Sequence, residues 1–153
     1  MDFFEVIIDT REQKPLKFSD PSIIGIAREK LDTGDYCIRG KEKDLFIERK
    51  ASIMEYYSNV ADDRFWRELE RAQSFKYKYL VLQCDLEQIT NFPYGCGMPK
   101  DKWKNFKLSA NFIMACTHRI MYHFGINVIF AGNEDTVTKM IERIMKDVAK
   151  NKV

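Results

Sequence analysis

The segment that decides the fold is Asp44-Leu45-Phe46-Ile47-Glu48-Arg49-Lys50, an apolar run that ends in three charged residues. Short apolar runs of this kind are typical of buried β-strands. Because successive side chains on a strand point to opposite faces, Glu48 and Lys50 should project together while Arg49 points the other way. The segment therefore predicts a strand that ends with a carboxylate and an ammonium group on one face.

A neighbouring strand is predicted over residues 36–39, just before this segment. The intervening residues, Gly40-Lys41-Glu42-Lys43, form a turn signal, so the two strands should pair as a hairpin. Asp35 directly precedes the first of these strands. The pairing would therefore bring Asp35 close to Glu48.

The chain begins with another apolar stretch, residues 3–10, which also predicts a strand. This strand ends in Asp9-Thr10-Arg11-Glu12. Acidic residues thus stand at the ends of three predicted strands. Each motif alone is common, and solvated strand-end charges that form ion pairs would explain it. Three such motifs together favour a metal site.

A pair of carboxylates from Asp35 and Glu48 suits Mg²⁺, which takes one or two protein carboxylates together with waters and phosphate oxygens. A lysine beside the ion can orient or polarise an attacking water, while the metal offsets charge that develops on a phosphate. The strand-end residues therefore predict metal-dependent hydrolysis of a phosphate ester, with Lys50 beside the reacting water.

The rest of the chain predicts alternating helices and strands without a linker long enough to divide it. Ile24, Ala27 and Leu31 recur at helical spacing after Asp20-Pro21, which resembles a capped helix start. A helix is predicted after Lys50 from the Ser52–Glu55 capping box, and a second one near Asp62 with an Arg64–Glu68 pair. The later predicted elements are a strand over 79–84, an irregular segment over 85–107, a helix over 108–124, a strand over 126–131 and a helix over 134–150.

Composition indicates one intracellular domain. The chain has 153 residues, 45% of them hydrophobic, and a formal net charge of only +2, so any nucleic-acid binding must depend on local charge. The four cysteines lack zinc-site spacing and predict free thiols in a reducing compartment. No signal peptide or membrane span is recognisable. We expect a soluble protein of the cytoplasm or the nucleus, without a membrane partner.

Three motifs resemble those of the nuclease domain of the XPF-type family of structure-specific endonucleases, within the restriction-endonuclease-like superfamily. They are Val6-Ile7-Ile8-Asp9-Thr10-Arg11-Glu12, Gly34-Asp35-Tyr36 and Ile47-Glu48-Arg49-Lys50. Further similarity at Asp63-Arg64-Phe65, at residues 79–82 and at residues 125–128 extends over nearly the whole chain. The resemblance implies an α/β fold with a restriction-endonuclease-like mixed sheet flanked by helices, in a single domain over residues 1–153.

The resemblance also implies roles for the acidic residues. Asp35 and Glu48 would bind Mg²⁺ or Mn²⁺ directly, helped by the backbone carbonyl of Arg49. Asp9 and Glu12 would complete the catalytic cluster. Lys50 would serve the attacking water.

Three arginines are implied to work around this cluster: Arg11, Arg49 and Arg64. They would contact DNA phosphates or brace the carboxylates, and the sequence does not separate these two roles. A separate segment, residues 100–107, carries four lysines and two aromatic residues. Lys102 and Lys104 could neutralise DNA phosphates while Trp103 stacks on a base; alternatively, the segment is a solvated face with its aromatic side chains in the core.

The sequence departs from the family pattern around the site. The aspartate that usually follows the Glu-Arg-Lys motif is replaced by Met54, the glycine before the helix arginine by Asp63, and a glutamine by Glu68. No helix-hairpin-helix module, which grips DNA and supports dimerisation in relatives, is recognisable. Substrate choice should then come from the domain itself, from a homodimer or from a partner protein.

The function that we expect is metal-dependent endonucleolytic hydrolysis of DNA, in branched, flap or nicked substrates. The main alternative is a non-catalytic DNA-binding or regulatory subunit that keeps the nuclease fold. A sequence-specific restriction-type nuclease is a further alternative.

Overall fold

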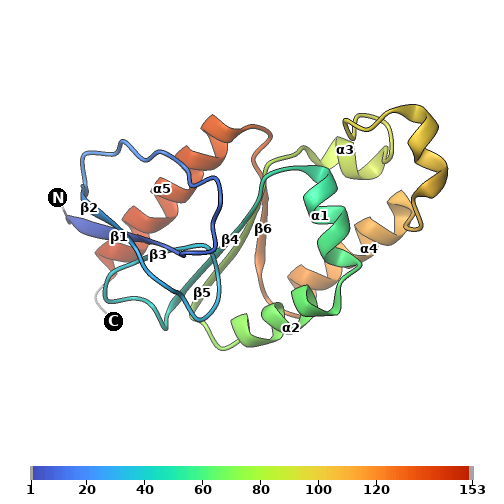
Figure 1. Ribbon diagram of the computed structural model, residues 1–153. Coiled ribbons are helices and arrows are strands. Elements are labelled where there is room, and N and C mark those ends of the chain that lie inside the picture. Colours follow the sequence, from blue (N-terminus) through green and yellow to red (C-terminus); the bar gives the residue numbers. More distant parts are fainter. Residues whose placement is uncertain (1, 152–153) are drawn as a thin grey trace.

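The computed structural model describes residues 2–151, which form a six-stranded sheet with helices on both faces (Figure 1). The strands, in their order across the sheet, are β2 (Ile23–Arg28), β1 (Phe4–Ile8), β3 (Tyr36–Ile38), β4 (Leu45–Lys50), β5 (Tyr77–Leu82) and β6 (Asn127–Phe130). Strand β3 is antiparallel to β1 and β4, and the other neighbours are parallel. The predicted single α/β domain with a mixed sheet is confirmed.

The helices cover the two faces of the sheet unequally. They are α1 (Ile53–Val60), α2 (Asp63–Ala72), the short α3 (Leu86–Thr90), the 3₁₀ helix η1 (Lys100–Asn105), α4 (Ala110–Tyr122) and α5 (Glu134–Lys150). Figure 1 shows α5 on one face, with α1, α2 and α4 on the other. Apolar side chains are buried in two separate clusters, one under α5 and one under the other helices. The sheet is therefore an inner layer whose strands need apolar residues on both faces.

Several local predictions are confirmed by the helix starts. Ser52 caps α1 and accepts a hydrogen bond from the backbone N–H of Glu55, as the capping motif predicts. Asp62 caps α2 in the same way. The last helix spans the predicted residues 134–150. The four cysteines are buried free thiols, as predicted. None of the described helices combines the length and apolarity needed to cross a membrane.

The helix predicted from Asp20-Pro21 to Leu31 is wrong, because this segment contains the edge strand β2. Its residues alternate between half-buried and exposed positions, with the period of two that a strand requires, and Ile24 is 70% exposed. The spacing of Ile24, Ala27 and Leu31 fits a helix equally well on paper. Parallel pairing with β1 decides between the two, because it supplies the hydrogen-bond partners of this backbone.

Candidate active site

Sheet topology brings the three acidic strand ends to one edge. Since β3 runs opposite to β1 and β4, its first residue meets the last residues of both neighbours. Asp9 follows β1, Asp35 precedes β3, and Glu48 lies near the end of β4. The backbone N–H of Asp9 donates to the carbonyl of Asp35 over 2.9 Å, which ties two of these ends together.

The hairpin orients Asp35 toward β4. Its backbone N–H donates to the carbonyl of Ile47, and its Oδ2 accepts from the backbone N–H of Arg49, both over 2.8 Å. The side chain is therefore held by the backbone of the strand that carries Glu48. The pairing of the two predicted hairpin strands is confirmed, and it places the Asp35 carboxylate beside β4.

Glu48 and Lys50 share a face of β4, as the strand period predicts. Lys50 Nζ lies 2.6 Å from Glu48 Oε2, and both side chains are buried, with 7% and 6% exposed. The same Nζ donates to Asn59 Oδ1 over 3.0 Å and lies 5.3 Å from the centre of the Phe65 ring. The ammonium group is thus fixed at one place between β4, α1 and α2.

Burial makes the two central carboxylates costly to charge. It raises the pKa of Asp35 to about 7, against the lowering effect of the Arg49 N–H. Burial and the charge of Asp35 together raise the pKa of Glu48 well above its usual range. Burial also acts on Lys50, but the ion pair with Glu48 outweighs it and raises the Lys50 pKa. The pair of carboxylates favours additional positive charge.

Asp9 and Glu12 flank this centre in different ways. Burial opposes the charge of Asp9, but hydrogen bonds from Arg11 and from the backbone N–H of Leu31 outweigh it and lower the pKa of Asp9. Glu12 accepts a hydrogen bond from the hydroxyl of Tyr36 over 3.2 Å. Glu12, Asp35, Glu48 and Lys50 line one hollow of about 670 Å³. All five residues predicted to be catalytic thus meet at one edge of the sheet.

The donor set fits a hard divalent cation. Within residues 2–151 no group of three or more His, Cys, Asp or Glu side chains converges as a metal cage. Mg²⁺ does not need one, because it keeps several waters and binds one or two carboxylates. Asp35 and Glu48 supply two carboxylates beside a hollow, and their mutual repulsion would be relieved by a cation.

Family membership follows from the sequence as a whole. A model of the ERCC4 domain matches residues 8–144, which include every strand end described above. The chain belongs to the ERCC4 domain family. No curated protein sequence matches it.

Solved structures agree on the fold of this ERCC4 domain. XPF from Aeropyrum pernix is similar with a TM-score of 0.66 at 15% identity, over 96% of this chain and 66% of that one. XPF from the same organism in complex with DNA gives a TM-score of 0.65 at 18% identity, with the same coverage. This chain therefore spans slightly less than two thirds of the length of these structures.

The predicted DNA-binding residues of the ERCC4 domain are dispersed. Arg11 pairs with Asp9 over 2.7 Å, and the exposed Arg64 pairs with Asp62. The Arg49 guanidinium is buried and donates to the carbonyl of Lys14 and to Gln83. Arg11 thus contacts a residue of the acidic cluster, whereas the Arg64 pair lies at the start of α2.

The other two predicted DNA contacts, Lys102 and Lys104, are exposed on η1. Figure 1 shows the segment between α3 and α4 at the end of the molecule opposite β1 and β2. Trp103 and Phe106 are partly buried against the core on that side.

Sequence reasoning placed Glu68 near the site by resemblance but gave it the wrong partner, and it missed Asn59. The predicted pair between Arg64 and Glu68 is wrong, since Arg64 turns to Asp62 at the helix start. Glu68 instead accepts from the backbone N–H of Gly34 over 3.4 Å and shares a hollow with Asp9, Asp35 and Glu48. Helical spacing shows that two residues are neighbours, but it does not show with which of several acidic neighbours an arginine forms its ion pair. No sequence signal marked Asn59 as the partner of Lys50.

The backbone at Gly34 leads to a first testable prediction. Its φ is +90°, and an added Cβ would lie 3.1 Å from the carbonyl oxygen of Ile47 and 3.2 Å from the Phe46 ring. Gly34→Ala should therefore lower the free energy of unfolding by about 1–3 kcal/mol, measured by denaturant titration. Gly40→Ala is the control, because Gly40 has a φ of +93° and nothing within 4 Å of the added carbon. Equal losses in the two variants would contradict a role for the close contact.

Proposed function

We propose that this ERCC4 domain is a divalent-metal-dependent endodeoxyribonuclease that hydrolyses phosphodiester bonds in DNA. The observation that carries the proposal is the geometry of the β4 end. There Lys50 Nζ stands 2.6 Å from Glu48, beside a second carboxylate that the hairpin holds in place. A purely structural ion pair would explain Lys50 and Glu48, but not the partly buried Asp35, for which no ion pair is found within residues 2–151.

Asp35 and Glu48, with the backbone carbonyl of Arg49, would hold Mg²⁺ or Mn²⁺. The bound ion supplies positive charge that stabilises the phosphate in the transition state. Lys50 would hold and polarise the attacking water. The contact with Asn59 keeps its ammonium group in position while it does so.

The outer residues support this arrangement. Asp9, fixed by Arg11 and by the Leu31 N–H, ties the end of β1 to the site. Glu12 completes the acidic wall on the side of Tyr36. We propose that these residues keep the carboxylates oriented and attract the cation, while exposed basic groups, including Arg64, Lys102 and Lys104, contact the DNA backbone.

Branched, flap or nicked DNA is the proposed substrate class, with roles in DNA repair or recombination. Support comes from membership in the ERCC4 family and from the fold shared with an XPF that was solved with DNA. We also propose that a second copy or a partner protein contributes to substrate choice.

A cleavage assay on flap, fork, nicked and linear duplex DNA tests the function. With Mn²⁺ or Mg²⁺ present, we expect cuts in the branched or nicked substrates, and none when EDTA removes the metal. DNA binding without any cleavage in Mn²⁺ would contradict the nuclease function and support a non-catalytic regulatory subunit. Cleavage of linear duplex at one fixed sequence would indicate a restriction-type enzyme.

A further inference from the structure

Helix α2 carries a row of three arginines on one side, Arg64, Arg67 and Arg71. Residues separated by three and four positions lie on the same helical face, and the row extends about 10 Å along the axis at 1.5 Å per residue. All three residues are exposed. The row can therefore be reached by a ligand in solution.

Arg67 and Arg71 differ from Arg64 in their partners. Arg64 forms an ion pair with Asp62 over 2.9 Å. In residues 2–151, neither Arg67 nor Arg71 takes part in a salt bridge or a side-chain hydrogen bond. The hydrogen bonds from Arg64 are the main cause of the lowered pKa of Asp62, and the charge of Arg67 adds slightly to this lowering. Both guanidinium groups keep their donors free for an external acceptor.

The fold does not explain this row. Like charges at i,i+3 and i,i+4 destabilise a helix by about 0.2–0.5 kcal/mol for each pair. Arg71 lies in the last turn, where it interacts favourably with the helix dipole. Arg67 lies in the middle of the helix, at helical spacing from Asp63 and Glu70, but within residues 2–151 it forms a salt bridge with neither. A binding role accounts for both residues.

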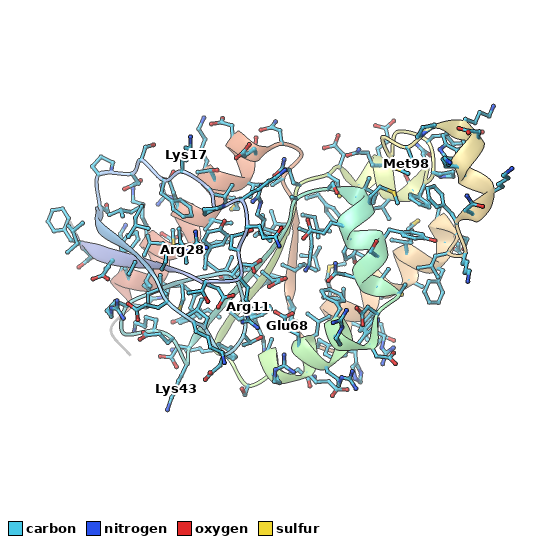
Figure 2. All side chains as sticks on the ribbon, viewed as in Figure 1. Arg11, Lys17, Arg28, Lys43, Glu68 and Met98 are labelled. Carbon is cyan, nitrogen blue, oxygen red and sulfur yellow. The ribbon has the colours of Figure 1, made fainter. Side chains whose placement is uncertain are left out.

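The row opens onto the acidic centre. Arg64, Arg67 and Arg71 line a hollow together with Arg11 and Glu68. Arg11, Glu68 and Arg71 also line the smaller hollow that contains Asp35 and Glu48. Figure 2 shows Arg11 and Glu68 next to each other between the strand ends and α2.

The two hollows thus share a wall formed by Arg11, Glu68 and Arg71. The smaller hollow also contains the carboxylates of Asp9, Asp35 and Glu48, whereas the other contains Arg64 and Arg67 beside Asp62. A polyanion that approaches the carboxylates would be repelled unless cationic groups flank them.

We propose that Arg67 and Arg71 form a track for the phosphate backbone of the DNA strand next to the acidic centre. The guanidinium group binds phosphate oxygens with two parallel hydrogen bonds, and the spacing along α2 allows two phosphates to be held at once. The track keeps the strand against the carboxylates without reading its sequence. The identity of the ligand as DNA rests on the proposed function.

The test compares two double variants that each remove two positive charges. Arg67→Ala with Arg71→Ala removes the track. Lys139→Ala with Arg143→Ala is the control on α5, where both residues are exposed and paired with Asp135 and Asp147. Binding to a flap DNA is measured by fluorescence anisotropy in EDTA, from 50 to 200 mM salt. Circular dichroism checks that both variants stay folded.

The track variant should bind DNA about tenfold or more weakly at 100 mM salt, and its salt slope should fall by about two units, one for each lost phosphate contact. The control should keep the wild-type slope. Equal losses in both variants would show a general effect of net charge and overturn the proposal, as would an unchanged slope or no DNA binding by wild type.

Because the binding assay contains no metal, it does not depend on catalysis. Track-dependent binding by a chain that cuts nothing would leave the track intact and contradict only the nuclease. Cleavage by wild type, together with an unchanged salt slope in the track variant, would support the nuclease and contradict the track.

Discussion

Lys50→Ala should slow single-turnover cleavage by about 10²-fold or more, the scale for losing one preorganised electrostatic group. The ammonium group is held by Glu48 and Asn59 beside the carboxylates. Neither another lysine side chain nor a cation from solution can replace it with the same geometry. Because Asp35 and Glu48 remain, the affinities for Mn²⁺ and for DNA should stay nearly unchanged. Rate and binding are measured in parallel on one flap substrate.

The ion pair adds a second expected effect of Lys50→Ala. Glu48 loses its counter-ion in a buried place, so the metal-free variant should be less stable than wild type, whereas Mn²⁺ should stabilise both proteins by similar amounts because its affinity is nearly unchanged. Thermal unfolding with and without Mn²⁺ measures both effects, and Lys139→Ala on α5 serves as an exposed-lysine control. Equal cleavage rates for wild type and Lys50→Ala would show that Lys50 has no catalytic role.

Asp35→Asn should remove metal binding and cleavage together. Loss of a group that only supports a metal ligand costs about 10–100-fold in metal affinity, and loss of a direct ligand should cost at least as much. The asparagine carbonyl oxygen can still accept the hydrogen bond from the Arg49 N–H, so the hairpin should stay intact. Isothermal titration with Mn²⁺ measures the affinity. The same heat of binding for wild type and variant would place the metal elsewhere.

The metal-free Asp35→Asn protein should also be more stable than wild type at pH 8. In the folded state the pKa of Asp35 is raised from 3.8 to about 7, so folding disfavours its charged form. The resulting destabilisation of wild type grows from about pH 4 and is complete above pH 7. The difference in thermal midpoint between wild type and variant should therefore be larger at pH 8 than at pH 5. A larger difference at pH 5 would contradict the raised pKa of this carboxylate.

Local patterns in the sequence were sufficient for the centre of the site. The strand period alone placed Glu48 and Lys50 on one face, and the hairpin signal alone placed Asp35 beside β4. The helix start at Ser52 also followed from local capping chemistry. These features depend on residues that are close together in the sequence, the most distant being the Asp35 carboxylate and the Arg49 N–H, which are 14 positions apart.

The edge strand and the partners of the charged side chains depended on tertiary structure. The spacing of Ile24 and Ala27 suits a helix or a strand, and only the hydrogen bonds offered by β1 select the strand β2. Arg64 had two possible partners of opposite charge, Asp62 and Glu68. It pairs with Asp62, while Glu68 accepts a hydrogen bond from the Gly34 N–H.

The sequence by itself therefore determined the chemistry at the strand ends, because a strand's alternation and a helix's capping are properties of adjacent residues. Tertiary structure decided which segment completes the sheet and how the charges are arranged around the centre. An unpaired backbone group or a long charged side chain takes whichever partner folding brings within reach, and that partner can lie anywhere in the chain. For this reason the acidic centre could be read from three motifs, whereas the arginine track on α2 emerged only when the walls of the two hollows were known.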